Sequence, residues 1–121
     1  MKYLAKFVNL EEDDKDIIVS FAIQDNEIDV RSLILHRMLF LEEMLDENEK
    51  GVIVSLEGEN LENENTNTLS IIKINNNEIN IISKYSKYMI DITKIDKKGK
   101  EDILSLLTKQ NYDNRFIIEN A

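Results

Sequence analysis

The residue types that most often carry catalysis are scarce in this chain, which has one histidine and no cysteine. Thiol nucleophiles and disulfides are therefore excluded, and a zinc site would need carboxylates for most of its ligands. A catalytic histidine needs a nucleophile or an orienting carboxylate nearby, and the chain neighbours of His36 are Leu35 and Arg37. We expect a structural role for His36, and no catalytic residue, metal site or cofactor.

Three acids near the start of the chain, Asp13, Asp14 and Asp16, could offer oxygen ligands to calcium. Their spacing does not match the Asp-x-Asp-x-Asp-Gly loop of calcium sites, and no glycine follows them. The glycines of the chain are isolated, so there is no glycine-rich phosphate loop. We expect residues 11–15 to form a charged, solvated loop.

Tyr85 and Tyr88 lie among lysines, a pattern that could stack on nucleic acid or form a protein interface. The simpler prediction is the end of a sheet with one of the two rings packed inside. Direct nucleic-acid binding is disfavoured, because phosphate contacts need clustered Lys and Arg, whereas this chain has a formal net charge of −9.

The acidic charge is concentrated in the first half of the chain. Residues 1–64 hold 17 acids and 6 bases, a net charge of −11, whereas residues 65–121 hold 7 acids and 9 bases, a net charge of +2. An acidic surface keeps a protein soluble, and it can also steer a basic partner into contact. The second property indicates a protein-binding role.

The acids closest to a plausible contact surface flank a predicted strand over residues 52–56. The candidate partner-binding residues are Glu42, Glu43, Asp46, Glu47, Glu49, Glu57, Glu59, Glu62 and Glu64. Charges at the rim of an interface speed association and select the partner. Reversal of Glu59, Glu62 and Glu64 to Lys is therefore expected to weaken binding at low salt.

The first half of the chain reads as strands. Residues 2–10 alternate and predict a hairpin with residues 17–23. One face of the first strand is expected to carry Tyr3, Ala5, Phe7 and Asn9. The apolar residues of segment 28–40 fit the two-residue repeat of a strand, but they also fit a helix. In a helix, one stripe would hold Leu33, Arg37, Phe40, Leu41 and Met44. A strand is favoured there, followed by a short helical turn over residues 41–46.

The second half predicts strands, one hairpin and one helix. After the strand over 52–56, residues 58–68 form a polar loop expected to be exposed. Strands over 69–74 and 78–83 flank Asn75-Asn76-Asn77, because asparagine tolerates left-handed backbone angles. Further strands are expected over 88–93 and 116–118.

The helix is predicted over residues 97–110 with Asp96 as its N-cap. Its apolar side is expected to carry Ile103, Leu106, Leu107 and Gln110. The whole chain, residues 1–121, is therefore predicted to be one α+β domain. Its antiparallel sheet should have about six or seven strands and be covered on one face by the C-terminal helix.

Residues 30–110 resemble the immunity proteins of bacterial polymorphic toxins, in particular immunity protein family ten. The resemblance lies in the strand Leu33-Ile34-Leu35-His36-Arg37-Met38-Leu39-Phe40, the acidic segment from Glu42 to Gly51 and the order of the elements that follow. Lys50-Gly51 replaces the aspartate-glycine pair of that family. The resemblance implies a small cytoplasmic protein that binds and neutralises a toxin domain, with no catalytic residues to carry over.

Two other classes of function stay open: a non-catalytic structural or regulatory component of a larger assembly, and a carboxylate-dependent enzyme. No membrane association is expected, because the longest apolar-rich stretch, residues 33–41, contains His36 and Arg37 and is far shorter than the ~20 residues that span a bilayer.

Overall fold

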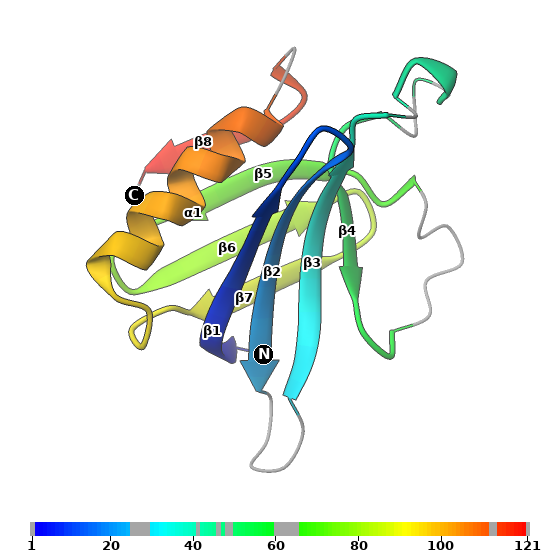
Figure 1. The fold of residues 1–121 in the computed structure, drawn as a ribbon. Coiled ribbons are helices and arrows are strands. Elements are labelled where there is room, and N and C mark those ends of the chain that lie inside the picture. Colours follow the sequence, from blue (N-terminus) through cyan, green and yellow to red (C-terminus); the bar gives the residue numbers. More distant parts are fainter. Residues whose placement is uncertain are drawn as a thin grey trace.

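The computed structural model describes residues 2–24, 30–40, 42–45, 47, 50–59, 66–111 and 114–120. This part of the chain forms an α+β fold with one mixed sheet and one α-helix (Figure 1). The elements are β1 (Lys2–Glu12), β2 (Asp16–Gln24), β3 (Val30–Met38), the 3-10 helix η1 (Glu42–Met44), β4 (Ile53–Leu56), β5 (Leu69–Ile74), β6 (Glu78–Ser83), β7 (Lys87–Asp91), α1 (Lys97–Gln110) and β8 (Ile117–Asn120).

The eight strands form one sheet in the order β4-β3-β2-β1-β7-β6-β5-β8. Most neighbours are antiparallel, but β1 pairs with β7 and β5 pairs with β8 in parallel. The prediction of six or seven antiparallel strands is therefore wrong in strand count and in these two pairings. Alternation along a sequence identifies a strand but does not reveal which distant strand lies beside it.

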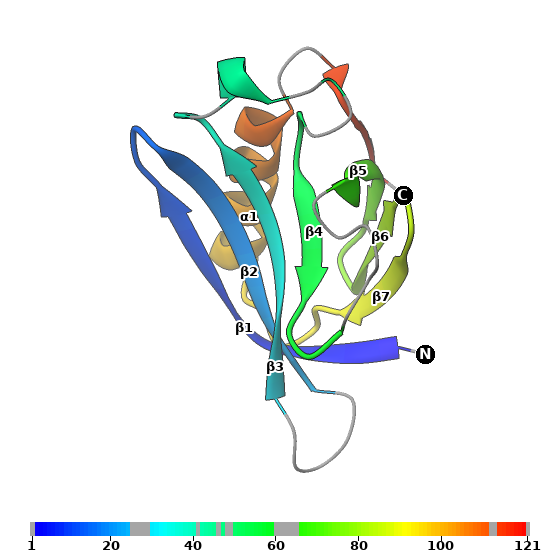
Figure 2. The same cartoon turned by 90° about the vertical axis from the view of Figure 1, so that its right-hand side faces the viewer.

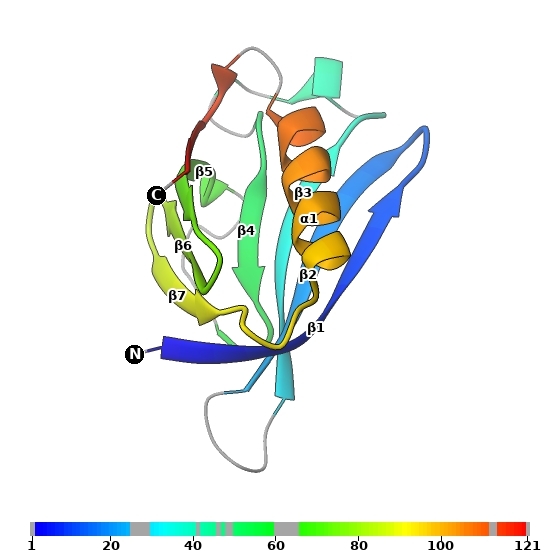
Figure 3. The same ribbon diagram turned by 90° about the vertical axis from the view of Figure 1, so that its left-hand side faces the viewer.

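The sheet is strongly curved, so its two halves face each other and α1 lies along the concave side (Figures 2 and 3). The curvature brings β4 back to the chain segment just before β5. Ile53 forms an isolated bridge with Thr68, and the N–H of Val54 donates to the carbonyl of Asn67 at 3.0 Å. The N–H of Leu69 donates to the carbonyl of Val52 at 2.8 Å. We call this contact the β4–β5 seam.

The alternation along β1 reverses at an irregularity between Ala5 and Phe7. Ala5 is fully buried and Phe7 is 56% exposed, whereas Val8 and Leu10 pack against the core. The expectation that Phe7 shares a face with Ala5 is wrong, because one extra residue in a strand turns the following side chains to the opposite face. β1 also continues to Glu12, so the connection to β2 is shorter than the predicted loop over 11–15.

Two tight turns of the sheet, between β1 and β2 and between β5 and β6, are held by the side chain of their first residue. Asp13 Oδ1 accepts hydrogen bonds from the N–H groups of Lys15 and Asp16, both at 2.8 Å. Asn75 Oδ1 does the same for Asn77 and Glu78, both at 2.8 Å. The predicted hairpin around residues 75–77 is confirmed, but its reason is different, because no residue of that turn has a positive φ. The asparagine side chain replaces the left-handed backbone.

The helix and its cap are confirmed. Asp96 accepts a hydrogen bond from the N–H of Gly99 at 2.7 Å, and α1 spans residues 97–110 as predicted. Its buried residues are Ile103, Leu106, Leu107 and Gln110. The Gln110 Nε2 group donates to the carbonyls of Ile17 (3.0 Å) and Leu35 (2.9 Å), and so ties the end of the helix to β2 and β3.

Candidate partner-binding surface

The acids predicted to bind a partner fall into two groups at opposite ends of β4. Glu42, Glu43 and Glu47 lie before β4, beside the end of β3, and Glu57 and Glu59 follow it. β4 is four residues long, so roughly 13 Å of strand lies between the groups at about 3.3 Å per residue. The other four candidates, Asp46, Glu49, Glu62 and Glu64, lie outside the described residues.

Two acids of the first group are bound by arginines. The Arg37 guanidinium donates to both carboxylate oxygens of Glu42, at 2.9 and 3.1 Å, and also to the carbonyl of Lys109 at 2.9 Å. The Arg115 Nη2 group lies 3.1 Å from both carboxylate oxygens of Glu47. These pairs anchor the segment around η1 to the C-terminal end of α1 and to the segment before β8. Glu42 therefore has a structural role that sequence reasoning did not indicate.

Both acids of the second group also have internal partners. The N–H of Ser32 donates to a Glu57 carboxylate oxygen at 3.1 Å. The Tyr88 hydroxyl donates to a Glu59 carboxylate oxygen at 2.6 Å. Burial and the neighbouring Glu59 carboxylate raise the pKa of Tyr88 to about 12. Glu59 is therefore part of the fold, and its replacement would disturb more than surface charge.

Among the described acids of the two groups, Glu43 is exposed and makes no hydrogen bond or ion pair with another described residue. It lies between Phe40 and Met44, which are 58% and 82% exposed and are the two most exposed large apolar side chains of the described residues. We call Phe40, Glu43, Met44 and Glu47 the η1 surface. Sequence reasoning missed Phe40 and Met44 as candidates because it placed Phe40 at the end of a strand and Met44 in a short helical turn, and it chose the contact surface from the acids alone.

The fold converts the charge asymmetry of the sequence into a spatial one. β1 to β4, all from the half of the chain with net charge −11, are contiguous in the sheet, and β5 to β8 make up the remainder. Figure 2 shows the same division, since β2, β3 and β4 lie to the left of β5, β6 and β7 in that view. The η1 surface belongs to the acidic half.

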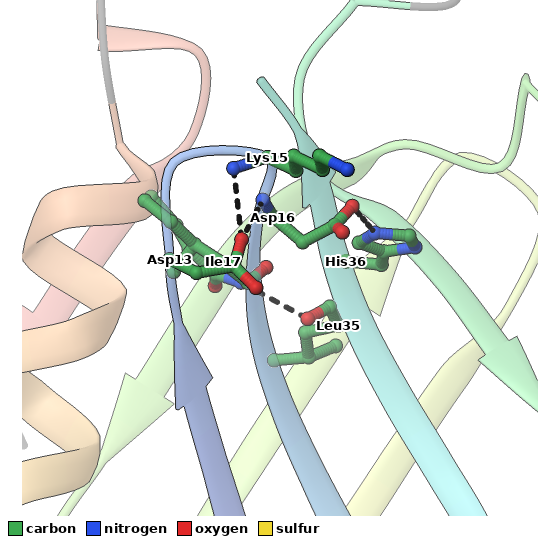
Figure 4. A network of polar contacts seen from close by, with 7 residues as sticks. Asp13, Lys15, Asp16, Ile17, Leu35 and His36 are labelled. Atoms are coloured by element: carbon green, nitrogen blue, oxygen red, sulfur yellow. Dashed lines mark hydrogen bonds and ion pairs between the residues drawn. The ribbon is translucent and has the colours of Figure 1, made fainter. Parts of the chain in front are cut away.

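His36 lies on the outward face of β3 and contacts the first residue of β2. Its Nε2 atom is 2.7 Å from Asp16 Oδ1, and both side chains are about one-third exposed (Figure 4). The neighbouring Asp13 carboxylate faces the turn backbone and not the histidine (Figure 4). Its hydrogen bonds to the N–H groups of Lys15 and Asp16 lower the pKa of Asp13. Among the residues described, no group of three or more His, Asp or Glu side chains is placed to hold a metal ion.

The tyrosine pair behaves as predicted, since Tyr88 is 3% exposed and Tyr85 is 45% exposed. A hydrogen bond with the Thr66 side chain and the nearby Lys84 lower the pKa of Tyr85. The Tyr88 ring packs 6.3 Å from the Tyr3 ring, centroid to centroid.

The segment expected to be an exposed polar loop over 58–68 contains a buried residue. Residues 60–65 lie outside the described part of the chain, but Asn67 is fully buried. Its Nδ2 group donates to the carbonyl of Val54 and to the Ser86 hydroxyl, both at 3.0 Å, and its Oδ1 accepts from the N–H of Tyr85 at 2.8 Å. Asn67 holds the β4–β5 seam together, so the expected exposure is wrong at this residue.

Comparisons with known proteins add no identification: no protein-family model, curated protein or solved structure matches the chain. The one helix among the described residues is too short and too polar to cross a membrane.

Proposed function

We propose that this protein acts by binding and neutralising a basic toxin domain, the partner class that the resemblance of residues 30–110 implies. The observation that carries the proposal is the η1 surface on the acidic half of the sheet. Phe40 and Met44 expose apolar side chains beside Glu43 and Glu47. Exposed aromatic and methionine side chains are enriched in protein interfaces, where charged residues form the rim.

The charges and the apolar side chains have separate roles in this proposal. The net charge of −11 on residues 1–64 attracts a basic domain and speeds the encounter, an effect that salt screens. Phe40 and Met44 supply apolar contacts that hold the complex after it forms. The partner is neutralised because the bound protein covers the surface with which it meets its own substrate.

The direct test is co-expression with a candidate toxin domain, taken from a large secreted toxin if one is encoded immediately upstream of this gene, followed by measurement of binding with the purified proteins. Wild-type protein is expected to restore growth and to bind the domain. A double substitution, Phe40→Ala and Met44→Ala, should weaken binding at least about 30-fold, because each exposed side chain is an apolar anchor in the proposed interface.

The matched control is Tyr85→Ala with Ile117→Ala, which removes two exposed large side chains (45% and 55%) from the other half of the chain. This control should bind within about threefold of wild type, since substitutions outside an interface change affinity little. A toxin domain that neither binds the wild-type protein nor loses toxicity in its presence would contradict the proposal.

A further inference from the structure

A second surface on the acidic half is notable for its lack of charge. In β2, β3 and β4, every second residue faces the core, and the residues between them face outward. The outward residues are Asp16, Ile18, Ser20, Ala22 and Gln24, of which Ala22 is itself buried, then Val30, Ser32, Ile34, His36 and Met38, then Ile53 and Ser55. Only Asp16 and His36 are ionisable, and these two contact each other at 2.7 Å.

The strand registers arrange the centre of this face in two rows. Ile34 pairs with Ser20 on one side and with Ser55 on the other. In the next row His36 lies between Ile18 and Ile53. Directly opposed residues in an antiparallel pair have Cβ atoms about 4.5–5.5 Å apart. Serine and alanine around Ile34 therefore leave room for a partner backbone or side chain to approach closely.

The outward face of the other half of the sheet is different. Lys73, Glu78, Lys87 and Asp91 occupy outward positions on β5, β6 and β7. Glu78 also pairs with Lys2 at 3.0 Å. Since both faces belong to one sheet, the contrast in charge is not a general property of this fold.

We propose that the outward face of β2, β3 and β4 is the centre of the interface with a basic folded domain whose contact surface is apolar at its centre. The inference rests on the proposed function and locates its binding site. The face is about 30 Å long, from nine residues per strand in β2 and β3, and about 10 Å wide between its outer strands. These dimensions give roughly 300 Å², so the η1 surface at one end, Glu57 at the other and the neighbouring surface would have to supply the rest of the ~800 Å² per partner of a stable interface.

Charge selects the class of partner. Acids lie at both ends of the face, Glu43 and Glu47 at one and Glu57 at the other. A second copy of this chain would bring like charges together at both ends and would be repelled. A domain with basic residues around an apolar centre would instead be attracted at both ends while its centre covers Ile34. Small and β-branched side chains on the face also lose little conformational entropy when they are covered.

The test compares Ile34→Arg with Ile82→Arg, a matched change on the outward face of β6 in the other half of the sheet. Both isoleucines are half-buried, so both variants carry a similar risk to folding. Each is first checked for wild-type circular dichroism and melting temperature. Binding to the purified toxin domain is then measured by calorimetry. Ile34→Arg should weaken binding at least about 30-fold, and Ile82→Arg should change it less than about threefold.

Ser20→Arg serves as the second variant if Ile34→Arg does not fold, because it replaces a polar outward residue in the same row. Hydrogen exchange of the wild-type complex needs no variant and should show slowed exchange in β3 and β4 but not in β6. If Ile34→Arg and Ser20→Arg both bind like wild type, the location is wrong while the proposed function stands. If the wild-type protein forms a homodimer and Ile34→Arg abolishes it, the proposed occupant is wrong, because the face then binds a second copy of this chain. Failure of the wild-type protein to bind the domain overturns the proposed function itself, and this inference with it.

Discussion

At the scale of single residues, polar side chains hold together parts of the chain that the sequence does not connect. Tyr88 donates to Glu59, and Gln110 donates to one carbonyl on each of β2 and β3. Asn67 hydrogen-bonds to Val54 of the β4–β5 seam and to Tyr85 and Ser86 of the turn between β6 and β7. Tyrosine and asparagine are common in loops and at surfaces, so composition does not reveal which of them will be buried. Their burial follows from the curvature of the whole sheet.

The tyrosines provide a test of the Tyr88–Glu59 contact by pH. In an absorbance titration near 295 nm, Tyr85 should ionise before Tyr88, because the pKa of Tyr85 is lowered and that of Tyr88 is about 12. An unfolded tyrosine loses its proton near pH 10. Between about pH 10 and 12 the folded state therefore binds more protons at Tyr88 than the unfolded state, and stability falls as the pH rises.

Tyr88→Phe removes this group and should flatten the fall in the free energy of unfolding between pH 9.5 and 11.5, measured by urea denaturation at about those values. An equally steep fall in this variant would place the effect elsewhere. The Tyr85→Phe variant is the control, because Tyr85 is half-exposed and its pKa is lowered.

Asn67 provides a test of the seam by stability. Asn67→Ala removes three hydrogen bonds inside the protein and should lower the free energy of unfolding by roughly 2–4 kcal/mol, because buried groups that lose a partner cost about 1–3 kcal/mol each. Asn80→Ala is the matched control, since the buried Oδ1 of Asn80 has no hydrogen-bond partner among the described residues. It should cost less than about 1 kcal/mol. Equal losses in the two variants would contradict a special role for Asn67.

At the scale of elements, local patterns predict what local interactions determine. The helix was predictable from the Asp96 cap and the spacing of its apolar residues. The β1–β2 and β5–β6 hairpins were predictable from polar turns between apolar runs. The irregularity after Ala5 was not predictable, because the sequence of β1 alternates in the same way whether or not one residue is left unpaired with β2. The two parallel pairings were not predictable either, because they join strands that are far apart in sequence.

The candidate site was predictable to a similar degree. The sequence located the acids on both sides of β4, and the charge count assigned them to one half of the chain. It did not indicate that Glu42 and Glu59 would bind other side chains of the protein, because those contacts involve Arg37, which also binds the end of α1, and Tyr88 of β7. It also did not indicate that Phe40 and Met44 would stay exposed, because their exposure depends on where β3 ends.

The helix cap provides a test at the element scale. Asp96→Ala should lower the free energy of unfolding by about 1 kcal/mol, because the N–H of Gly99 loses its acceptor at the start of α1. Asp96→Asn keeps an acceptor and should cost only a few tenths of that. Urea denaturation followed by circular dichroism measures both. An unchanged midpoint for Asp96→Ala would mean that the cap does not contribute to the stability of α1.

At the scale of the whole molecule, the order of the strands keeps each half of the sequence together in space. In the acidic half, the outward face of β2 to β4 has only Asp16 and His36 as ionisable residues and has acids at its ends, whereas the outward face of β5 to β7 carries both signs of charge. A charge distribution of this kind acts at a distance, so its effect should be visible in the rate at which a basic partner associates and not only in the final affinity.

The most direct measurement of the central claim is the association rate with the toxin domain at about 20 and 300 mM salt, for wild type and two charge-reversed variants. The first carries Glu43→Lys and Glu57→Lys on the acidic half; the second carries Glu101→Lys and Glu119→Lys on the other half, so the net charge changes equally. At low salt the first variant should associate at least about tenfold more slowly than the second, and the difference should disappear at high salt. Equal rates for the two variants at low salt would contradict binding through the acidic half.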